Sequence, residues 1–80
     1  MKMPRDISGQ ELIKQFKKLG YSVTRQSGSH IRLTTSENGE HHITIPNHSQ
    51  LKIGTLSAIL TDVANHFNKT KDEIVNELFG

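Results

Sequence analysis

Hydrophobic positions change their spacing along the chain, and these changes mark the expected elements. From Ser8 to Gly20, and again over residues 54–67, they recur every three or four residues, which is the spacing of one face of a helix. Over residues 21–46 apolar and polar positions alternate instead, as they do in strands that are buried on one side. The pattern therefore predicts a helix, a group of strands and a second helix.

The ends of these elements are marked by capping and turn residues. Ser8 and Glu11 form a capping box at the start of the first helix, and Gly20 is suited to its end. The same box recurs at Thr70 and Glu73, so a short last helix is expected after it. The expected strands are residues 21–25, 30–35 and 41–45.

The register of the second hairpin follows from its apolar residues. A two-residue loop at Asn38–Gly39 would place Leu33 opposite a threonine and divide the apolar residues between the two faces of the hairpin. A three-residue loop, residues 37–39 with Gly39 in the left-handed conformation, places Leu33 opposite Ile43 instead. We therefore predict the three-residue loop.

Together these elements predict an α+β fold in the order α-β-β-β-α, followed by a short C-terminal helix. Three antiparallel strands form one sheet, the helices pack on one face of it, and the other face is open. The residues expected on the open face are all polar: Ser22, Thr24, His30, Arg32, Thr34, His42 and Thr44. Because this face has no aromatic platform, it is better suited to contact with a nucleic-acid backbone than to the stacking of bases.

Length and composition limit the class of protein. Eighty residues are enough for one domain, residues 1–80, with one small core. The chain has no cysteine, which excludes disulfides and thiolate metal sites. No apolar run approaches the roughly 18 residues that span a membrane. We therefore expect a cytoplasmic protein that makes no contact with a membrane.

The net charge of +2 is unevenly distributed. Residues 1–36 carry seven Lys or Arg against two acids, a balance of +5, whereas residues 37–80 carry three against six, a balance of −3. A basic first half is suited to a polyanion such as RNA, and a solubilising surface is the alternative. The basic residues include Lys14 and Lys18, which lie off the apolar stripe of the first helix.

The segment Gly28-Ser29-His30 carries the most chemistry. Gly28 and Ser29 form a flexible turn with room for an RNA backbone, and the turn delivers His30 to the first position of a strand. Arg32 shares the face of His30, because side chains alternate along a strand. Histidine is the side chain that exchanges protons near neutral pH. His30 is therefore a candidate acid–base group beside a phosphate-binding arginine; an ordinary surface histidine is the alternative.

The predicted register decides which other histidines could act with His30. Four residues of strand, roughly 13 Å, separate it from His42, so His42 is neither its catalytic nor its metal partner. His48 follows the last strand and is close enough to be a second proton-transfer group. His41 and His42 point to opposite faces and have no carboxylate at ligand spacing, so no metal and no cofactor are predicted.

A further candidate contact lies at the start of the second long helix. Lys52 precedes Ile53 and Gly54 there, beside backbone N–H groups that are free to donate. Such a position is suited to a phosphate. A helix start with an incidental lysine is the alternative.

Four parts of the chain resemble, in order and spacing, the HicA (YcfA-like) toxins, small mRNA interferases of toxin–antitoxin pairs. They are Ser8–Leu12 with Leu19–Tyr21, Ser27–His30, Ile43–His48, and Leu51–Leu56 followed by Ile59–Leu60. The resemblance covers nearly the whole chain. It implies a fold like that of the double-stranded RNA-binding domain, in agreement with the order of elements given above.

The resemblance also implies a function and a site. His30 matches the histidine of the family's glycine-serine-histidine motif, which implies that it is the catalytic residue of a metal-independent endoribonuclease acting on mRNA. A HicB-like antitoxin is the implied protein partner. Two positions depart from the family: Ser27 stands where a basic residue is common, and a single Lys52 where a basic pair is common. We therefore expect the phosphate contacts to shift to Arg25 and Arg32.

The expected mechanism is cleavage of an RNA phosphodiester by the neighbouring ribose 2′-hydroxyl. His30 acts as general acid or base in this reaction, and Arg25, Arg32 and Lys52 stabilise the charge on the phosphate. Two other classes of function are open on the sequence alone. One is a non-catalytic RNA-binding module that uses the open face and the lysines of the first helix. The other is a protein whose polar face only docks another protein.

Overall fold

The computed structural model, which describes residues 3–80, has the order of elements that the hydrophobic pattern predicts. The elements are α1 (Gly9–Phe16), the 3₁₀ helix η1 (Lys17–Leu19), β1 (Ser22–Ser27), β2 (His30–Thr35), β3 (His41–Pro46), α2 (Ile53–His66) and α3 (Lys71–Phe79). The strands form one antiparallel sheet in the order β1-β2-β3. The predicted α+β fold is therefore confirmed.

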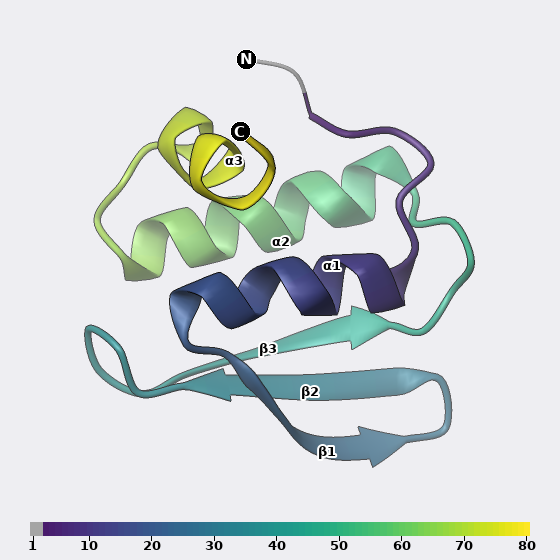
Figure 1. The fold of residues 1–80 in the computed structure, drawn as a ribbon. Helices are drawn as coiled ribbons and strands as arrows, with labels where there is room; N and C mark the ends of the chain where they lie inside the picture. The colour runs from purple at the N-terminus through teal and green to yellow at the C-terminus, as the bar shows by residue number, and fades with distance from the viewer. Residues whose placement is uncertain (1–2) are drawn as a thin grey trace.

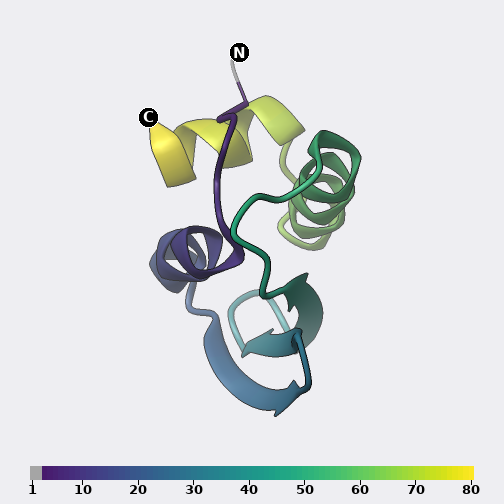
Figure 2. The same cartoon turned by 90° about the vertical axis from the view of Figure 1, so that its right-hand side faces the viewer.

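The elements are arranged in three layers. α1 and α2 lie side by side on one face of the sheet, and α3 lies across their outer side (Figure 1, Figure 2). No helix of the described residues covers the opposite face, which we call the uncovered face (Figure 1). The core contains residues from every layer, and Leu12, Phe16, Leu33, Leu60 and Ile74 are fully buried. None of the helices in residues 3–80 has the length and apolar character needed to cross a membrane.

Both predicted capping boxes are present. The Ser8 hydroxyl accepts from the Glu11 backbone N–H at 3.1 Å, and the Glu11 carboxylate accepts from the Ser8 N–H at 3.1 Å. Thr70 and Glu73 make the same pair of bonds at the start of α3. Gly20 ends the first helical segment with φ +81°, in the left-handed conformation. Local sequence signals therefore determine where the first and last helices begin.

The register of the second hairpin is also the predicted one. Leu33 pairs with Ile43, both are buried, and Thr34 pairs with His42 on the uncovered face. Gly39 has the expected positive φ, +96°, and Asn38 before it has φ +58°. The isoleucine and leucine side chains of β2 and β3 therefore all face the helices, as burial requires.

The edge strand β1 differs from the other two because no helix covers it. It lies at the side of the sheet that curves away from α1 and α2 (Figure 2). All six of its residues are exposed, and Val23 keeps 50% of its surface accessible. The strand extends over Ser22–Ser27 rather than the expected residues 21–25, because pairing with β2 continues up to the turn.

Candidate nucleic-acid interface

His30 lies at the end of a tight turn, on the uncovered face. Ser27 pairs with His30, which leaves Gly28 and Ser29 as a two-residue loop. Gly28 has φ +58°, the sign that a type II′ turn requires at its first loop residue. His30 is exposed, and its imidazole has no hydrogen-bond partner within residues 3–80. The ring is therefore free to contact a ligand.

A β-bulge places two arginines beside this histidine. The register shifts by one residue between Val23 and Arg25, so that Arg25 lies directly opposite Arg32 on the face of His30. Like charges at directly opposed positions destabilise a sheet. Neither guanidinium has an acidic partner in the described part of the chain. A bound anion would relieve this repulsion, because an arginine fork matches the oxygens of a phosphate.

The other half of the uncovered face is held by a polar network. Thr24 Oγ1 lies 2.8 Å from Thr34 Oγ1, which lies 2.7 Å from His42 Nδ1. His42 Nε2 lies 2.8 Å from the carboxylate of Glu40. The two ends of the uncovered face therefore differ in charge. The end at the β1–β2 turn carries Arg25 and Arg32, and the end at the β2–β3 loop carries the carboxylate of Glu40, which is bonded to His42.

The loop after β3 joins the His30 turn to the start of α1. The Asn47 N–H donates to the Ser29 carbonyl at 2.6 Å, and the Gly9 N–H donates to the His48 carbonyl at 2.9 Å. The Gln10 side chain donates to Asn47 Oδ1 at 3.0 Å. These bonds hold exposed His48 at the same end of the molecule as His30. The separation of His30 from His42, about four residues of strand or 13 Å, follows from the confirmed register.

Gly9 makes this junction possible. A Cβ atom at Gly9 would lie 2.1 Å from the Pro46 carbonyl oxygen and 3.3 Å from the Asn47 Cα. Both neighbours are backbone atoms, which have little freedom to move away. A glycine is therefore needed where α1 meets the end of β3.

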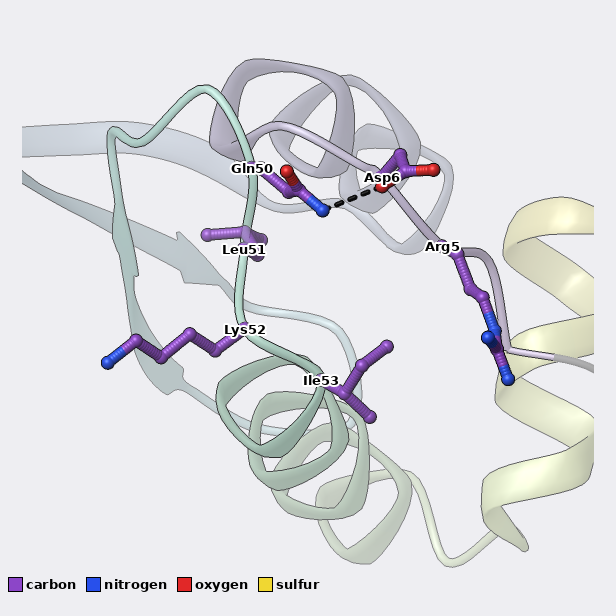
Figure 3. A pocket seen from close by; sticks show the side chains of 6 residues that line it. All are labelled: Arg5, Asp6, Gln50, Leu51, Lys52 and Ile53. Carbon is purple, nitrogen blue, oxygen red and sulfur yellow. Dashed lines mark hydrogen bonds between the residues drawn. The ribbon is translucent and has the colours of Figure 1, made fainter.

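Lys52 stands at the same end, beside a hollow at the start of α2 (Figure 3). The hollow has a volume of about 630 Å³ and is lined by Arg5, Asp6, Gln50, Leu51, Lys52 and Ile53. Lys52 is exposed and points away from Arg5, and no side chain caps the helix that it precedes (Figure 3). The Gln50 amide donates to Asp6 Oδ1 at 2.6 Å and joins the two sides of the hollow.

The structure does not bring Lys14 and Lys18 together with these residues. Both belong to the α1–η1 segment, on the side of the sheet opposite to the uncovered face. Lys18 Nζ donates to the Leu78 carbonyl at 2.9 Å, and it thereby satisfies an acceptor near the end of α3. Lys14 is exposed on α1. The helices pack on the covered face, so their lysines lie apart from His30.

A cluster of histidines that the sequence does not predict lies at the end of the sheet opposite to His30. The Tyr21 hydroxyl lies 2.7 Å from His41 Nδ1, and His41 Nε2 lies 3.2 Å from Asp62. Burial, and secondly the charge of Asp62, raise the pKa of Tyr21 above its usual range. The His66 ring stacks on His41 with centroids 4.4 Å apart and donates from Nε2 to the Glu37 carbonyl. The cluster ties α2 to β3 and the β2–β3 loop.

The only sequence signal for this cluster is the alternation of His41 and His42. That alternation predicts opposite faces for the two rings, and their separate hydrogen-bond partners confirm it. Nothing local indicates that Asp62 and His66 lie against His41, since they are more than twenty residues away. Across residues 3–80, no three His, Asp or Glu side chains are placed so that they could hold a metal ion.

Comparison with curated proteins and with solved structures gives no match. A family model described as the HicA toxin of bacterial toxin–antitoxin systems matches residues 9–64. The matched segment contains the whole sheet, α1 and most of α2, and therefore His30, Arg25, Arg32, His48 and Lys52. Since it spans more than half of the sequence, this chain belongs to the HicA toxin family.

Proposed function

We propose that this toxin is an endoribonuclease that cleaves mRNA and that His30 is its catalytic residue. The observation that carries the proposal comes from residues 3–80: an exposed imidazole with no hydrogen-bond partner there lies beside two arginines with no acidic partner, on a face that no described helix covers. A phosphodiester carries a negative charge, and Arg25 and Arg32 have no negatively charged partner within residues 3–80. It is also the group on which a histidine can act without a protein nucleophile, since RNA carries its own 2′-hydroxyl.

In the proposed reaction the 2′-oxygen attacks the adjacent phosphorus. A bond forms between these two atoms, and the bond from phosphorus to the 5′-oxygen of the next nucleotide breaks. One proton leaves the 2′-hydroxyl and one is delivered to the departing 5′-oxygen. His30 carries one of these transfers, a role that contributes typically about 10²- to 10⁴-fold to rate. His48, held at the same end by the Gly9 bond, is the candidate for the other transfer.

The cations stabilise the negative charge that builds up on the phosphate oxygens. Arg25 and Arg32 form the next strand pair on the same face of the sheet as His30. Lys52 extends the cationic surface toward the start of α2. Gly28 and Ser29 leave the approach open, because a Cβ added at Gly28 would meet no atom within 4 Å. Donors that are already in place lower the barrier without reorganising during the reaction.

The protein partner in this proposal is a HicB-like antitoxin that covers the uncovered face around His30. Membership of the toxin family implies a toxin–antitoxin pair. An acidic surface on the antitoxin would complement Arg25 and Arg32 and would exclude RNA from the same place.

The test is cleavage of RNA by the purified chain, together with growth arrest on expression, for the parent and for His30→Ala. We expect the variant to lose cleavage by at least about 10²-fold. His66→Gln, which removes an imidazole at the opposite end of the sheet, is the matched control and should retain cleavage. Full activity of His30→Ala would refute the role of His30, and RNA that is bound but left intact by the parent would favour a non-catalytic module.

A further inference from the structure

The ring of His42 is fixed on the uncovered face, and the proposed cleavage does not use it. Its Nδ1 lies 2.7 Å from the Thr34 hydroxyl and its Nε2 lies 2.8 Å from the Glu40 carboxylate. The carboxylate only accepts hydrogen bonds, so Nε2 carries the hydrogen, and in the neutral ring Nδ1 accepts from Thr34. Both nitrogens are therefore occupied. The side chain nevertheless keeps 38% of its surface accessible.

With its nitrogens occupied, the imidazole offers a ligand mainly its aromatic faces. The ring belongs to a chain of hydrogen bonds that continues through Thr34 to Thr24 and so crosses all three strands. This chain holds the ring in one orientation before any ligand arrives. A ligand that stacks on it would therefore lose little binding energy to the ordering of the side chain.

The charges along the face separate two kinds of contact. Measured along the strands, the Arg25–Arg32 pair lies between the positions of His30 and His42, whereas Glu40 lies beyond His42, in the β2–β3 loop. A phosphate is attracted to the arginines and repelled by the carboxylate. A nucleotide that reached His42 would therefore present its uncharged base rather than its backbone.

We propose that His42 is a stacking platform for an unpaired base of the RNA whose phosphate lies at His30. This inference rests on the proposed function and adds that the substrate is single-stranded at the contact. Bases in a single strand have free faces that stack on aromatic rings, histidine included, whereas bases in a duplex already stack on one another. A stacked strand advances about 3.4 Å per nucleotide, so the roughly 13 Å to His42 spans at most about four nucleotides.

This proposal differs from the expectation that the open face has no aromatic platform. That expectation rests on the absence of Phe, Tyr and Trp from the face, and the described strands indeed contain none. Sequence alone does not show that an imidazole has both nitrogens bonded. With both nitrogens bonded within the chain, the ring of His42 has no free hydrogen-bonding atom for a ligand and contacts it through its faces.

The test compares three substitutions of His42, each made in the His30→Ala chain so that the RNA stays intact. Phe keeps a ring but loses both hydrogen bonds; Gln can keep a hydrogen bond but has no ring; Ala loses both. The probe is a short single-stranded RNA with one fluorescent aminopurine, whose emission falls when the base stacks. The chain has no Trp and a single Tyr, so its own fluorescence interferes little.

We expect the chain with His30→Ala and His42→Phe to bind the single strand about as tightly as the chain with His30→Ala alone. The two chains should also quench the aminopurine equally. His42→Gln and His42→Ala should bind about tenfold more weakly and quench less, a loss within the range measured for base–aromatic stacking. A duplex of the same sequence is the control ligand, and its affinity should be the same for all four chains.

The opposite order of affinities would overturn the inference. If His42 acts only through its hydrogen bonds, Gln will bind better than Phe, and single-stranded and duplex RNA will be affected alike. Unchanged binding by His42→Ala would also overturn it while leaving the proposed function intact. If neither the parent nor the His30→Ala chain binds RNA of either form, the proposed function fails, and this inference fails with it.

Discussion

Substitution of Gly9 by alanine tests whether the junction between α1 and the end of β3 depends on close packing. Gly9 is the first residue of α1, where alanine would by itself favour the helix by up to about 1 kcal/mol. The added Cβ would lie 2.1 Å from the Pro46 carbonyl oxygen, so helix and strand must move apart by about 1 Å or more to reach ordinary contact. The structure therefore predicts destabilisation where helix propensity predicts the reverse.

Two terms set the magnitude. Overpacking of this kind costs about 1–3 kcal/mol. The separation also stretches the bond from the Gly9 N–H to the His48 carbonyl, 2.9 Å in the structure, which is worth about 0.5–1.5 kcal/mol. After the gain of up to about 1 kcal/mol in helix propensity, we expect a net loss of about 0.5–3.5 kcal/mol in the free energy of unfolding. For a domain of this size that lowers Tm by roughly 2–28 °C.

Gly54→Ala is the matched control, because Gly54 also lies in the first turn of a helix. A Cβ there would meet no atom within 4 Å, so only the propensity term remains and the variant should be as stable as the parent or up to about 1 kcal/mol more stable. Urea and thermal unfolding, followed by the helical circular dichroism signal, measure both variants. A Gly9→Ala chain that is as stable as the Gly54→Ala chain would refute the packing argument.

Two further predictions concern charge. Arg25→Thr relieves the repulsion with Arg32, so the free energy of unfolding should rise by about 0.2–1 kcal/mol. The affinity for RNA and the salt dependence of that affinity should both fall, because one phosphate contact is lost. An equal loss of RNA affinity in Lys14→Ala would show that the helices bind the RNA instead. Hydrogen bonding to the Thr70 backbone N–H lowers the pKa of Glu73 below its ordinary 4.5, so the carboxylate stabilises α3 above that pH and less as the pH falls through the lowered pKa. Glu73→Gln should therefore lower Tm at neutral pH and flatten its decrease in acid, and a Tm difference that stays constant from neutral pH into acid would contradict this.

Several features of the fold could be predicted because they depend on residues close together in the chain. The capping boxes at Ser8 and Thr70 join side chains to backbone groups three residues away. The register of the β2–β3 hairpin follows from one requirement, that Leu33 and Ile43 share the buried face. The position of His30, first in its strand and on the uncovered face, follows from the same alternation.

The candidate site could be predicted only in part, because its residues meet through contacts between distant segments. His30 and Arg32 share a face by simple alternation, but Arg25 joins them only because a bulge forms at Thr24. His48 reaches this end of the molecule through bonds of its loop to Ser29 and Gly9. Lys18, expected to contact RNA, instead donates to the end of α3, sixty residues later.

By itself, then, the sequence determined the order of the elements, the caps of the first and last helices, the hairpin register and the position of His30 in its strand. These features depend on side-chain period and on hydrogen bonds within a few residues, which any stretch of chain carries with it. The tertiary structure decided which cations stand beside His30, that Gly9 must lack a side chain, and that both nitrogens of His42 are bonded. Each of these depends on how closely two separate segments approach, and that distance is set only when the whole core packs.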